Sequence, residues 1–334
     1  MTLIKHIAWH VPERCVTNSA LAQQFPTLKI KELTRLTGVE ERHISAVGET
    51  SADLAVKAAE KLFSENKIDK SSIDFIIFCT SGGDYITPAS ACVIQNRLGL
   101  SQHCGAFDFN QGCTGYLYGL SLADSLIKAG NANRVLLLTG ETIHRVIHPN
   151  DPNTLALFGD GASATLLEAN NKNNIGRFIF GTDGSQYDQI IVRHGRERHP
   201  LPESAEPDYT DAFGNIKNHA KLYMNGGSVF NFTLEKAPGL FNQLLKDTGL
   251  MPEDIDYFIF HQANRIVLET LGKKLRIPAE KIIIELDDVG NTVSSSIPIA
   301  IKKSIDKGII KKGDTLMIAG FGVGLSWGGS IVKI

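Results

Sequence analysis

The sequence predicts an α/β protein made of two similar halves, and an internal repeat is the main evidence for it. Three segments recur in the same order at nearly the same offset: IDFIIFCTS (73–81) with IDYFIFHQA (255–263), residues 112–130 with 290–308, and RVLLLTG (134–140) with DTLMIAG (314–320). The period is far too long for a solenoid. Each half is expected to be a sheet fed by crossover helices, with equivalent strand–helix turns of the two halves meeting near a pseudo-twofold axis.

Apolar patterning gives the elements of the first half in order. Residues 2–9 predict a strand, residues 18–47 are polar and helix-like or loop-like, and residues 51–66 predict an amphipathic helix. The continuous apolar run at 73–78 is typical of a strand buried on both faces of a sheet. The predicted elements that follow are a helix at 88–98, a strand at 106–109, a helix that ends at Gly130, and strands at 134–140 and 162–168.

A change of composition suggests where the two halves meet. Residues 170–220 are rich in Asn, Gly, Pro, Arg and His and show no clear periodicity, which is more typical of a cap over a site than of a domain. From residue 222 the pattern of helix and apolar strand resumes. We therefore expect an N-terminal half at 1–170 that carries Cys113, an insertion at 171–221, and a C-terminal half at 222–334 that carries His261 and Asn291.

Composition excludes several function classes. The chain has 334 residues, 43% of them hydrophobic and 21% charged, as in an ordinary globular protein. A net charge of −2 gives no reason to expect nucleic-acid binding. The N-terminus lacks the apolar core of a signal peptide, and the uncharged, glycine-rich stretch at 315–332 is read as strand and loop. The expectation is a cytoplasmic protein with no membrane partner.

Cys113 is the candidate nucleophile, because it stands at the start of the predicted helix that follows the strand at 106–109. Unpaired N–H groups at a helix start lower a thiol pKa, and Gly112 and Gly115 leave room for a ligand. The alternative is a small buried side chain without chemistry, which is commoner for a free Cys. The other cysteines are expected to be structural, because no CxxC pair and no His at zinc-ligand spacing occurs; no metal is predicted, and a reduced compartment fits.

The repeat brings two more polar residues toward Cys113. In the aligned halves Asn291 occupies the position of Cys113, and His261 occupies that of Cys79. Both follow a strand, where α/β sheets bind ligands. Cys, His and Asn together suit acyl transfer, because a thiolate takes the acyl group and two polar groups stabilise developing negative charge. Taken singly, His261 could be an ordinary hydrogen-bonded histidine, and Asn291 a turn residue.

Six motifs are spread over nearly the whole length of the chain: TGVEERHI (37–44), AFDFNQGCTGYLYGL around Cys113, FGDGASA (158–164), HQAN (261–264), GNTVSSSIP (290–298) and GFGVGLSWG (320–328). With these motifs the chain resembles 3-oxoacyl-[acyl-carrier-protein] synthase III, the initiating condensing enzyme of the thiolase-like superfamily. Chalcone-type synthases share Cys, His and Asn, but HQAN and GFGVGLSWG favour synthase III. Elongation synthases that use Cys, His and His are less similar.

The resemblance implies a thiolase-like fold in αβαβα layers, a homodimer and two half-reactions. Cys113 takes an acyl group from a thioester on coenzyme A or acyl carrier protein. His261 and Asn291 then bind a malonyl group on acyl carrier protein, and the enolate left by loss of CO₂ attacks the acyl-Cys to give a 3-oxoacyl product. The backbone N–H groups of Cys113 and Val323 would form the oxyanion hole, where the family has Gly at position 323. Apart from these carriers, no cofactor is implied.

Binding regions are implied with some departures from the family. Residues 262–266 (Gln262, Ala263, Asn264, Arg265 and Ile266) match the carrier-protein contact, but the family's Arg stands one residue later, where this chain has Ile266. Basic residues further along could meet an acidic carrier helix, or form a solvated helix face: Lys273, Lys274 and Arg276. Thr87 replaces a large aromatic that the partner subunit places at the mouth of the acyl pocket, and Phe158, Met224 and Phe230 match other pocket positions.

The groups that clamp coenzyme A in the family are replaced here. The positions of a Trp and two Arg hold Glu32, Leu36 and Pro152. The acyl donor is therefore expected to be acyl carrier protein, or coenzyme A bound differently. Two other functions stay open: transfer of the acyl group from Cys113 to an amine or hydroxyl, and a non-catalytic partner subunit, although such subunits tend to lose the nucleophile.

Overall fold

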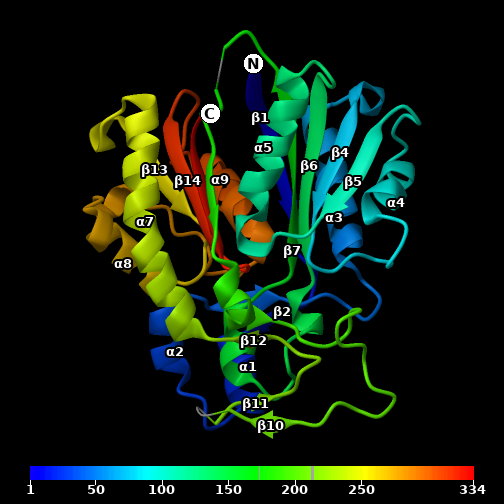
Figure 1. Cartoon of the computed structure of the whole chain (residues 1–334), viewed down its shortest axis with the longest axis vertical. Coiled ribbons are helices and arrows are strands. Elements are labelled where there is room, and N and C mark those ends of the chain that lie inside the picture. The colour runs from blue at the N-terminus through cyan, green and yellow to red at the C-terminus, as the bar shows by residue number, and fades with distance from the viewer. Residues whose placement is uncertain (173, 212–213) are drawn as a thin grey trace.

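Two β-sheets form the centre of the molecule (Figure 1). The structure is a computed structural model that describes residues 1–172, 174–211 and 214–334. In sheet order, the first sheet holds β1 (Thr2–His10), β7 (Gly161–Ala169), β6 (Arg134–Glu141), β4 (Phe75–Cys79) and β5 (Gly105–Phe109). The second holds β13 (Tyr257–Phe260), β14 (Thr315–Gly322), β15 (Ser326–Lys333) and β8 (Ile179–Thr182).

The two sheets repeat one another strand for strand. The order β1-β7-β6-β4 corresponds to β8-β15-β14-β13, and the pairings are antiparallel, antiparallel and parallel in both. Only a bridge between Phe258 and Ile282 stands where the first sheet has β5. The prediction of two similar α/β halves is therefore confirmed.

Helices fill the space between the sheets and cover both outer faces (Figure 1). Between the sheets lie α5 (Gly115–Lys128) and α9 (Ser296–Asp306), whose apolar faces share one buried core with both sheets. Outside the first sheet lie α3 (Ser51–Asn66) and α4 (Ser90–Arg97), and outside the second α7 (Gly226–Thr248) and α8 (Arg265–Leu275). The predicted αβαβα layering is confirmed.

Local sequence explains where these helices begin and end. Thr50 and Asp53 form a capping box at the start of α3, in which each side chain bonds the other's backbone N–H. Beyond α5, Gly130 adopts a left-handed conformation (φ +76°), as expected for the residue that ends a helix. None of the helices in the described residues is long and apolar enough to cross a membrane.

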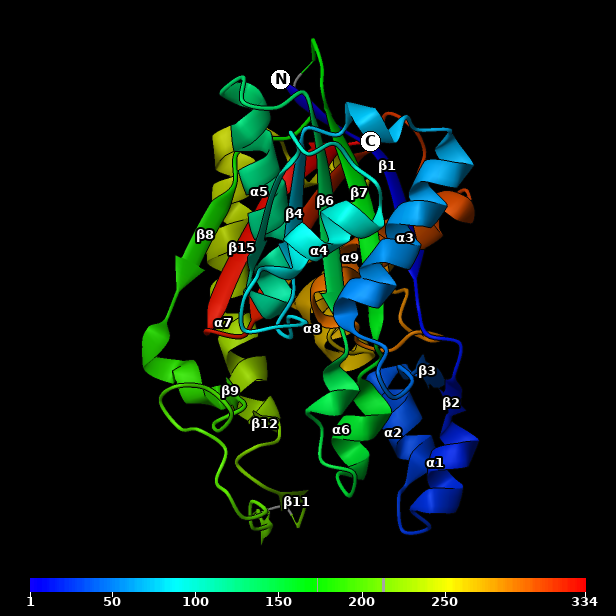
Figure 2. The same cartoon turned by 90° about the vertical axis from the view of Figure 1, so that its right-hand side faces the viewer.

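Two insertions at equivalent places build one end of the molecule, at the bottom of Figures 1 and 2. The first follows β1 and the second follows β8, and each ends at the first outer helix of its half. The first contains β2 (Cys15–Thr17), α1 (Asn18–Gln24), α2 (Ile30–Thr37) and β3 (Glu41–His43). The second contains β9 (Ile190–Ile191), β10 (Tyr209–Thr210), β11 (Ile216–Lys217) and β12 (Tyr223–Met224).

The other elements of the described residues are one helix and several short 3₁₀ turns. The helix is α6 (Pro152–Leu157), and the 3₁₀ turns are η1 (Lys70–Ser72), η2 (Gly112–Thr114), η3 (Ile143–Arg145), η4 (Gly184–Gln189), η5 (Pro252–Asp254), η6 (Ala279–Lys281) and η7 (Val293–Ser295).

β8 bears on the predicted division of the chain. It lies inside the range 171–221 that was predicted to be an insertion, yet it pairs with β15 as the edge strand of the second sheet. Its four residues lie in a stretch without alternating apolar residues, so periodicity gave no sign of it. The division into 1–170, 171–221 and 222–334 stays a prediction, and in the structure the second insertion begins after Thr182.

Candidate active site

Cys113, His261 and Asn291 line one cavity of about 1010 Å³. Cys113 lies in η2, directly before α5, and Asn291 lies two residues before η7, which leads into α9. His261 is the first residue after β13. Each side chain is nearly buried, with 9%, 5% and 4% of its surface exposed, respectively. The thiol thus comes from one half of the molecule, and the imidazole and carboxamide come from the other.

Two glycines of β14 let that strand approach Cys113. A Cβ on Gly322 would lie 2.5 Å from Cys113 Sγ, and one on Gly320 would lie 2.8 Å from the Cys113 carbonyl oxygen. Both separations are below ordinary van der Waals contact, so a side chain at either position would displace the nucleophile. The glycines in GFGVGLSWG are therefore needed to bring the second half against the thiol.

Burial dominates the acidity of Cys113. It raises the pKa of the thiol to about 11, against the lowering effect of a backbone hydrogen bond at Val323; the charge of Glu141 raises the pKa further, and a backbone hydrogen bond at Cys113 itself lowers it. The sequence predicted a lowered pKa from the helix start, and this expectation is wrong, because loss of hydration outweighs the N–H groups. The free thiol is protonated at neutral pH.

Val323 presents its backbone N–H to the sulfur in an ordinary conformation. The φ angle of Val323 is not positive, so its backbone does not need the left-handed region that favours glycine. Its Cγ2 lies 3.0 Å from the point where a Cβ of Gly112 would stand, so the valine side chain covers that glycine. Replacing the family's Gly by Val at this position leaves the backbone donor in place.

His261 is held by a neighbouring hydroxyl. Its Nδ1 lies 2.7 Å from Ser296 Oγ, and the backbone N–H of Gln262 donates to the same oxygen at 3.3 Å. Burial lowers the pKa of His261 to about 4, and a hydrogen bond with the backbone of Val293 acts in the opposite direction. The ring is therefore neutral at pH 7. In the tautomer with the proton on Nε2, the Ser296 hydroxyl donates to Nδ1.

Asn291 is oriented by the turn that it begins. Its Oδ1 accepts the backbone N–H of Val293 at 2.9 Å, and its Nδ2 donates to the carbonyl of Ala263 at 3.4 Å. This leaves the second proton of the amide for a ligand. Val293 has φ +52°, a strained conformation for a β-branched residue, and it also lines the cavity. The sequence contained no sign of this strain.

Glu141 is a cavity residue that the sequence did not single out. It is 1% exposed, and burial raises the pKa of its carboxyl group to about 7. The Ser81 N–H donates to Glu141 at 3.2 Å and the Ser294 hydroxyl at 2.9 Å, and the Ser81 hydroxyl also donates to the carboxyl. Its position at the end of the apolar strand β6 could have been noticed, because strand ends feed ligand crevices.

Comparison with known proteins gives the family. Family models described as 3-Oxoacyl-[acyl-carrier-protein (ACP)] synthase III and its C terminal match residues 107–184 and 245–334. The beta-ketoacyl-[acyl-carrier-protein] synthase III of Clostridium perfringens is 36% identical over 326 residues, covering 97% of both chains. That of Fusobacterium nucleatum is 35% identical over 331 residues, covering 99% of this chain and 98% of the relative. The chain belongs to the synthase III family.

Solved structures agree with this assignment. A crystal structure of a 3-oxoacyl-(acyl-carrier-protein) synthase III is 44% identical and superposes with a TM-score of 0.97, covering 100% of this chain and 99% of the other. A 3-oxoacyl-(acyl-carrier protein) synthase from Burkholderia xenovorans gives 34% identity and a TM-score of 0.91, covering 100% of this chain and 94% of the other. This synthase III chain is accordingly an acyltransferase of the condensing type.

The residues predicted to bind the carrier protein differ in their exposure. Ala263, Asn264 and Ile266 line the cavity, and Ile266 is 40% exposed. Gln262 is only 1% exposed, and its carboxamide bonds the backbone at Phe260, Ile283 and Glu285. The prediction that Gln262 contacts a carrier is therefore wrong.

Arg265, the basic residue of this region, lies beside the first insertion. It is half-buried, and its Cβ lies 2.8 Å from where a Cβ of Gly38 would stand. Further along the chain, Lys273, Lys274 and Arg276 are exposed. This exposure fits either reading of the three, a contact with an acidic carrier helix or a solvated face.

Three of the four predicted pocket residues line the cavity: Phe158, Met224 and Phe230. Thr87 lies on an exposed loop and does not line the cavity of its own chain. Its proposed place is in the pocket of the partner subunit, so this role stays a prediction. The positions of the lost coenzyme A clamp (Glu32, Leu36 and Pro152) are likewise absent from the lining.

Proposed function

We propose that this synthase III uses Cys113 as acyl carrier and uses His261 and Asn291 for decarboxylative condensation with malonyl-acyl carrier protein. The observation that carries the proposal is the shared cavity, which all three predicted catalytic residues line. A nucleophile and two polar groups that line one cavity have the composition that acyl transfer needs.

Acylation begins with the thiolate of Cys113 attacking the carbonyl carbon of a thioester. The carbonyl electrons move to oxygen, where the backbone N–H groups of Cys113 and Val323 stabilise the negative charge. When the carbonyl re-forms, the carrier thiolate leaves and takes up a proton. Because the pKa of Cys113 is about 11, the thiol must lose its proton to the bound reactants or solvent as the attack proceeds.

Condensation uses the neutral His261. The malonyl carboxylate leaves as CO₂, and the electron pair of that bond forms an enolate whose oxygen lies between His261 Nε2–H and the free Asn291 Nδ2–H. Two neutral donors in a buried site stabilise this oxygen without a competing charge. The enolate carbon attacks the acyl group on Cys113, the thiolate leaves, and a 3-oxoacyl thioester is released.

We propose acyl carrier protein and a second copy of this chain as its partners. The apolar side chains of Tyr85 and Ile86, beside Thr87, are 61% and 94% exposed, and β5 is an edge strand of the first sheet. Exposed apolar side chains beside an unpaired edge are the features that an interface between copies would cover. Thr87 would then reach the partner's cavity. No cofactor is proposed apart from the phosphopantetheine thioester of the substrates.

The donor is proposed to be acyl-acyl carrier protein, or an acyl-coenzyme A held in an unusual way. Glu32, which stands where the family has part of its adenine clamp, is exposed on α2 and would repel the phosphates of coenzyme A. Leu36 and Pro152 supply no cation. Comparing acylation of Cys113 by acetyl-coenzyme A and by acyl carrier proteins tests this, and efficient micromolar use of acetyl-coenzyme A would contradict it.

Intact-mass spectrometry tests the function directly. The chain is offered a panel of acyl-coenzyme A and acyl-carrier thioesters, and we expect a mass gain of one acyl group, which Cys113→Ala abolishes. CO₂ release from malonyl-acyl carrier protein is measured next, and His261→Ala should abolish it while leaving the mass gain. Acylation without His261-dependent CO₂ release would instead support transfer to an amine or hydroxyl. No acylation by any member would leave only the role of a non-catalytic subunit.

A further inference from the structure

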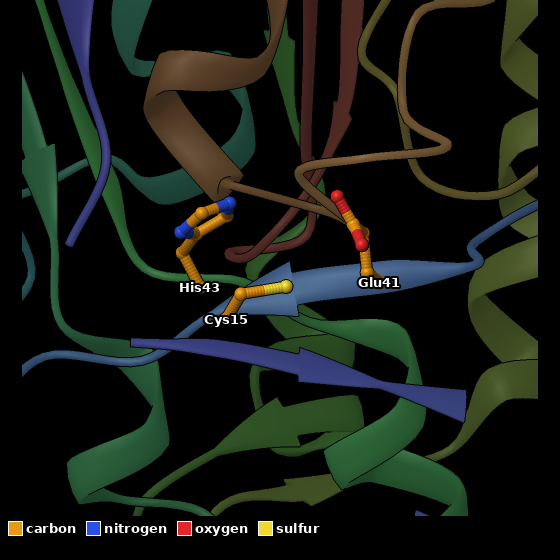
Figure 3. Close-up of side chains that lie close together, drawn as sticks. All are labelled: Cys15, Glu41 and His43. Atoms are coloured by element: carbon orange, nitrogen blue, oxygen red, sulfur yellow. The ribbon is translucent and has the colours of Figure 1, made fainter. Parts of the chain in front are cut away.

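A second group of reactive side chains lies outside the cavity, on the hairpin of β2 and β3. Cys15 pairs directly with His43 in the antiparallel register, and Thr17 pairs with Glu41. Because side chains alternate along a strand, Glu41, His43 and Cys15 project from the same face. One potential ligand atom from each lies within 4.8 Å of the others, and Figure 3 shows the ring and the carboxylate on either side of the sulfur.

The hydrogen bonds of His43 leave it ready to bind a cation. Its Nδ1 lies 2.6 Å from the carbonyl oxygen of Pro12, and since a carbonyl can only accept, Nδ1 carries the proton. The neutral ring therefore keeps a free lone pair on Nε2. A backbone carbonyl bonded to the other ring nitrogen is the usual support of a metal-binding histidine, because it fixes the tautomer and the ring orientation.

Cys15 and Glu41 offer a thiol and a carboxylate on the same face of the hairpin, within reach of one ion (Figure 3). A divalent cation between them would replace the thiol proton and offset the charges of the resulting thiolate and of the carboxylate. Thiolate, imidazole and carboxylate form the mixed sulfur, nitrogen and oxygen set that suits Zn²⁺.

The opposite face of the hairpin is fixed, so the ligands are held on a rigid frame. Arg42 is fully buried and donates to the carbonyls of Val16 at 2.9 Å and Ala156 at 2.6 Å. The backbone of β3 is tied as well, because Glu41 N–H donates to Asp287 O at 3.0 Å and Asp160 N–H donates to His43 O at 2.9 Å. The backbone that carries Glu41 and His43 is therefore tied to the rest of the molecule.

We propose that Cys15, Glu41 and His43 bind a Zn²⁺-like divalent cation, with water in the remaining position. In such a site the ion lies about 2.3 Å from sulfur and about 2.0–2.2 Å from nitrogen and oxygen. The sequence predicted no metal, because Cys15 and His43 are far apart along the chain and only the hairpin pairs them. None of the three lines the cavity.

The consequence of binding is stability of the first insertion. Asp287, which accepts the N–H groups of both Glu40 and Glu41, lies in the loop that leads to Asn291. A cation on the hairpin would therefore stabilise the support of that loop without contacting substrate. An ion that binds only the folded chain raises its melting temperature with concentration.

Metal binding by the full-length chain tests the proposal. Every protein carries Cys113→Ala, so that the cavity thiol cannot contribute. Co²⁺ is the spectroscopic probe, since a thiolate ligand gives an intense charge-transfer band, and Zn²⁺ is measured by chelator competition. We expect one equivalent of Zn²⁺, with at least tenfold weaker binding in Cys15→Ser and in His43→Gln. The matched control is Cys92→Ser, another exposed cysteine, which should bind as tightly as the parent.

Two outcomes would overturn the assignment. One is a chain that takes up no Zn²⁺ below millimolar concentration and shows no rise in melting temperature. The other is a Co²⁺ band that persists unchanged in both Cys15→Ser and His43→Gln. Melting in EDTA shows whether each variant is folded, and the two variants remove different ligands, so failure of one to fold leaves the other to decide.

Discussion

Removing the Ser296 hydroxyl should impair one half-reaction and spare the other. Ser296 Oγ lies 2.7 Å from His261 Nδ1, on the side of the ring that faces away from the proposed enolate. The Gln262 N–H already donates to that oxygen at 3.3 Å, which favours the hydroxyl as the donor to Nδ1 and the ring proton on Nε2. Ser296→Ala removes this preference. The Nε2–H group that donates to the enolate oxygen is then absent in part of the molecules. Attack by Cys113 on the acyl thioester does not require this donor.

The size of the effect follows from the one hydrogen bond that is deleted. A buried neutral hydrogen bond contributes about 1 kcal/mol, with a range of about 0.5–1.5. Since about 1.4 kcal/mol in the barrier corresponds to a tenfold change in rate, Ser296→Ala should slow CO₂ release by about two- to twelvefold. Acylation of Cys113 should change by less than about twofold, and the KM for malonyl-acyl carrier protein should stay nearly constant while kcat falls.

The neighbouring serine provides a matched control. Ser295 is equally buried, but its hydroxyl bonds Thr139 Oγ1 at 2.8 Å and the carbonyl of Gly161 at 3.3 Å. Ser295→Ala should cost stability without separating the half-reactions. Mass spectrometry follows acylation and labelled CO₂ follows decarboxylation. Equal losses of CO₂ release in the two variants, or a parallel loss of acylation in Ser296→Ala, would refute a role in fixing the tautomer.

Three further predictions concern the same cavity. Gly322→Ala places a Cβ 2.5 Å from Cys113 Sγ, so acylation should fall at least tenfold, whereas Gly184→Ala, with nothing within 4 Å, should leave it unchanged. Because the pKa of Cys113 is about 11, its alkylation by iodoacetamide, read by mass against Cys113→Ala, should rise about tenfold per pH unit from pH 7 to 10; a plateau above pH 8.5 would contradict this. The pKa of His261 is lowered to about 4 in the folded chain, so the unfolded chain binds a proton at this ring more readily. Lowering the pH from 7 to 4 should therefore reduce the free energy of unfolding by about 3 kcal/mol more in the parent than in His261→Asn, as measured by urea denaturation.

The architecture could be predicted from the sequence because it depends on apolar periodicity. β4 and β13 are short apolar runs at the same place in the repeat, and both are buried strands in the structure. Because each apolar run must be buried on both faces, it has to be a central strand of a sheet that is covered by helices on both sides. β8 was not predicted, because an edge strand of three half-buried residues and one exposed residue needs no such apolar run.

Residue type and the repeat predicted which side chains meet in the site, but not their burial or acidity. The repeat places Asn291 opposite Cys113, but the thiol pKa depends on burial, which no local pattern reports. Gln262 illustrates the opposite error. The resemblance to synthase III placed it in the carrier-protein contact, whereas its carboxamide satisfies backbone groups of two neighbouring segments in the interior.

The duplication explains why chemistry and recognition are separable in this molecule. Cys113 and Asn291 stand just before the central helices α5 and α9, and His261 stands at the end of β13. Packing there is tight, because a Cβ at Gly322 would lie 2.5 Å from Cys113 Sγ. The cap residues, among them Leu222 and Met224, come instead from the second insertion between β8 and α7. A surface connection tolerates changes of length and sequence far better than a packed layer does. Substrate preference in this chain can therefore change through the insertions while the thiol, imidazole and carboxamide keep their geometry.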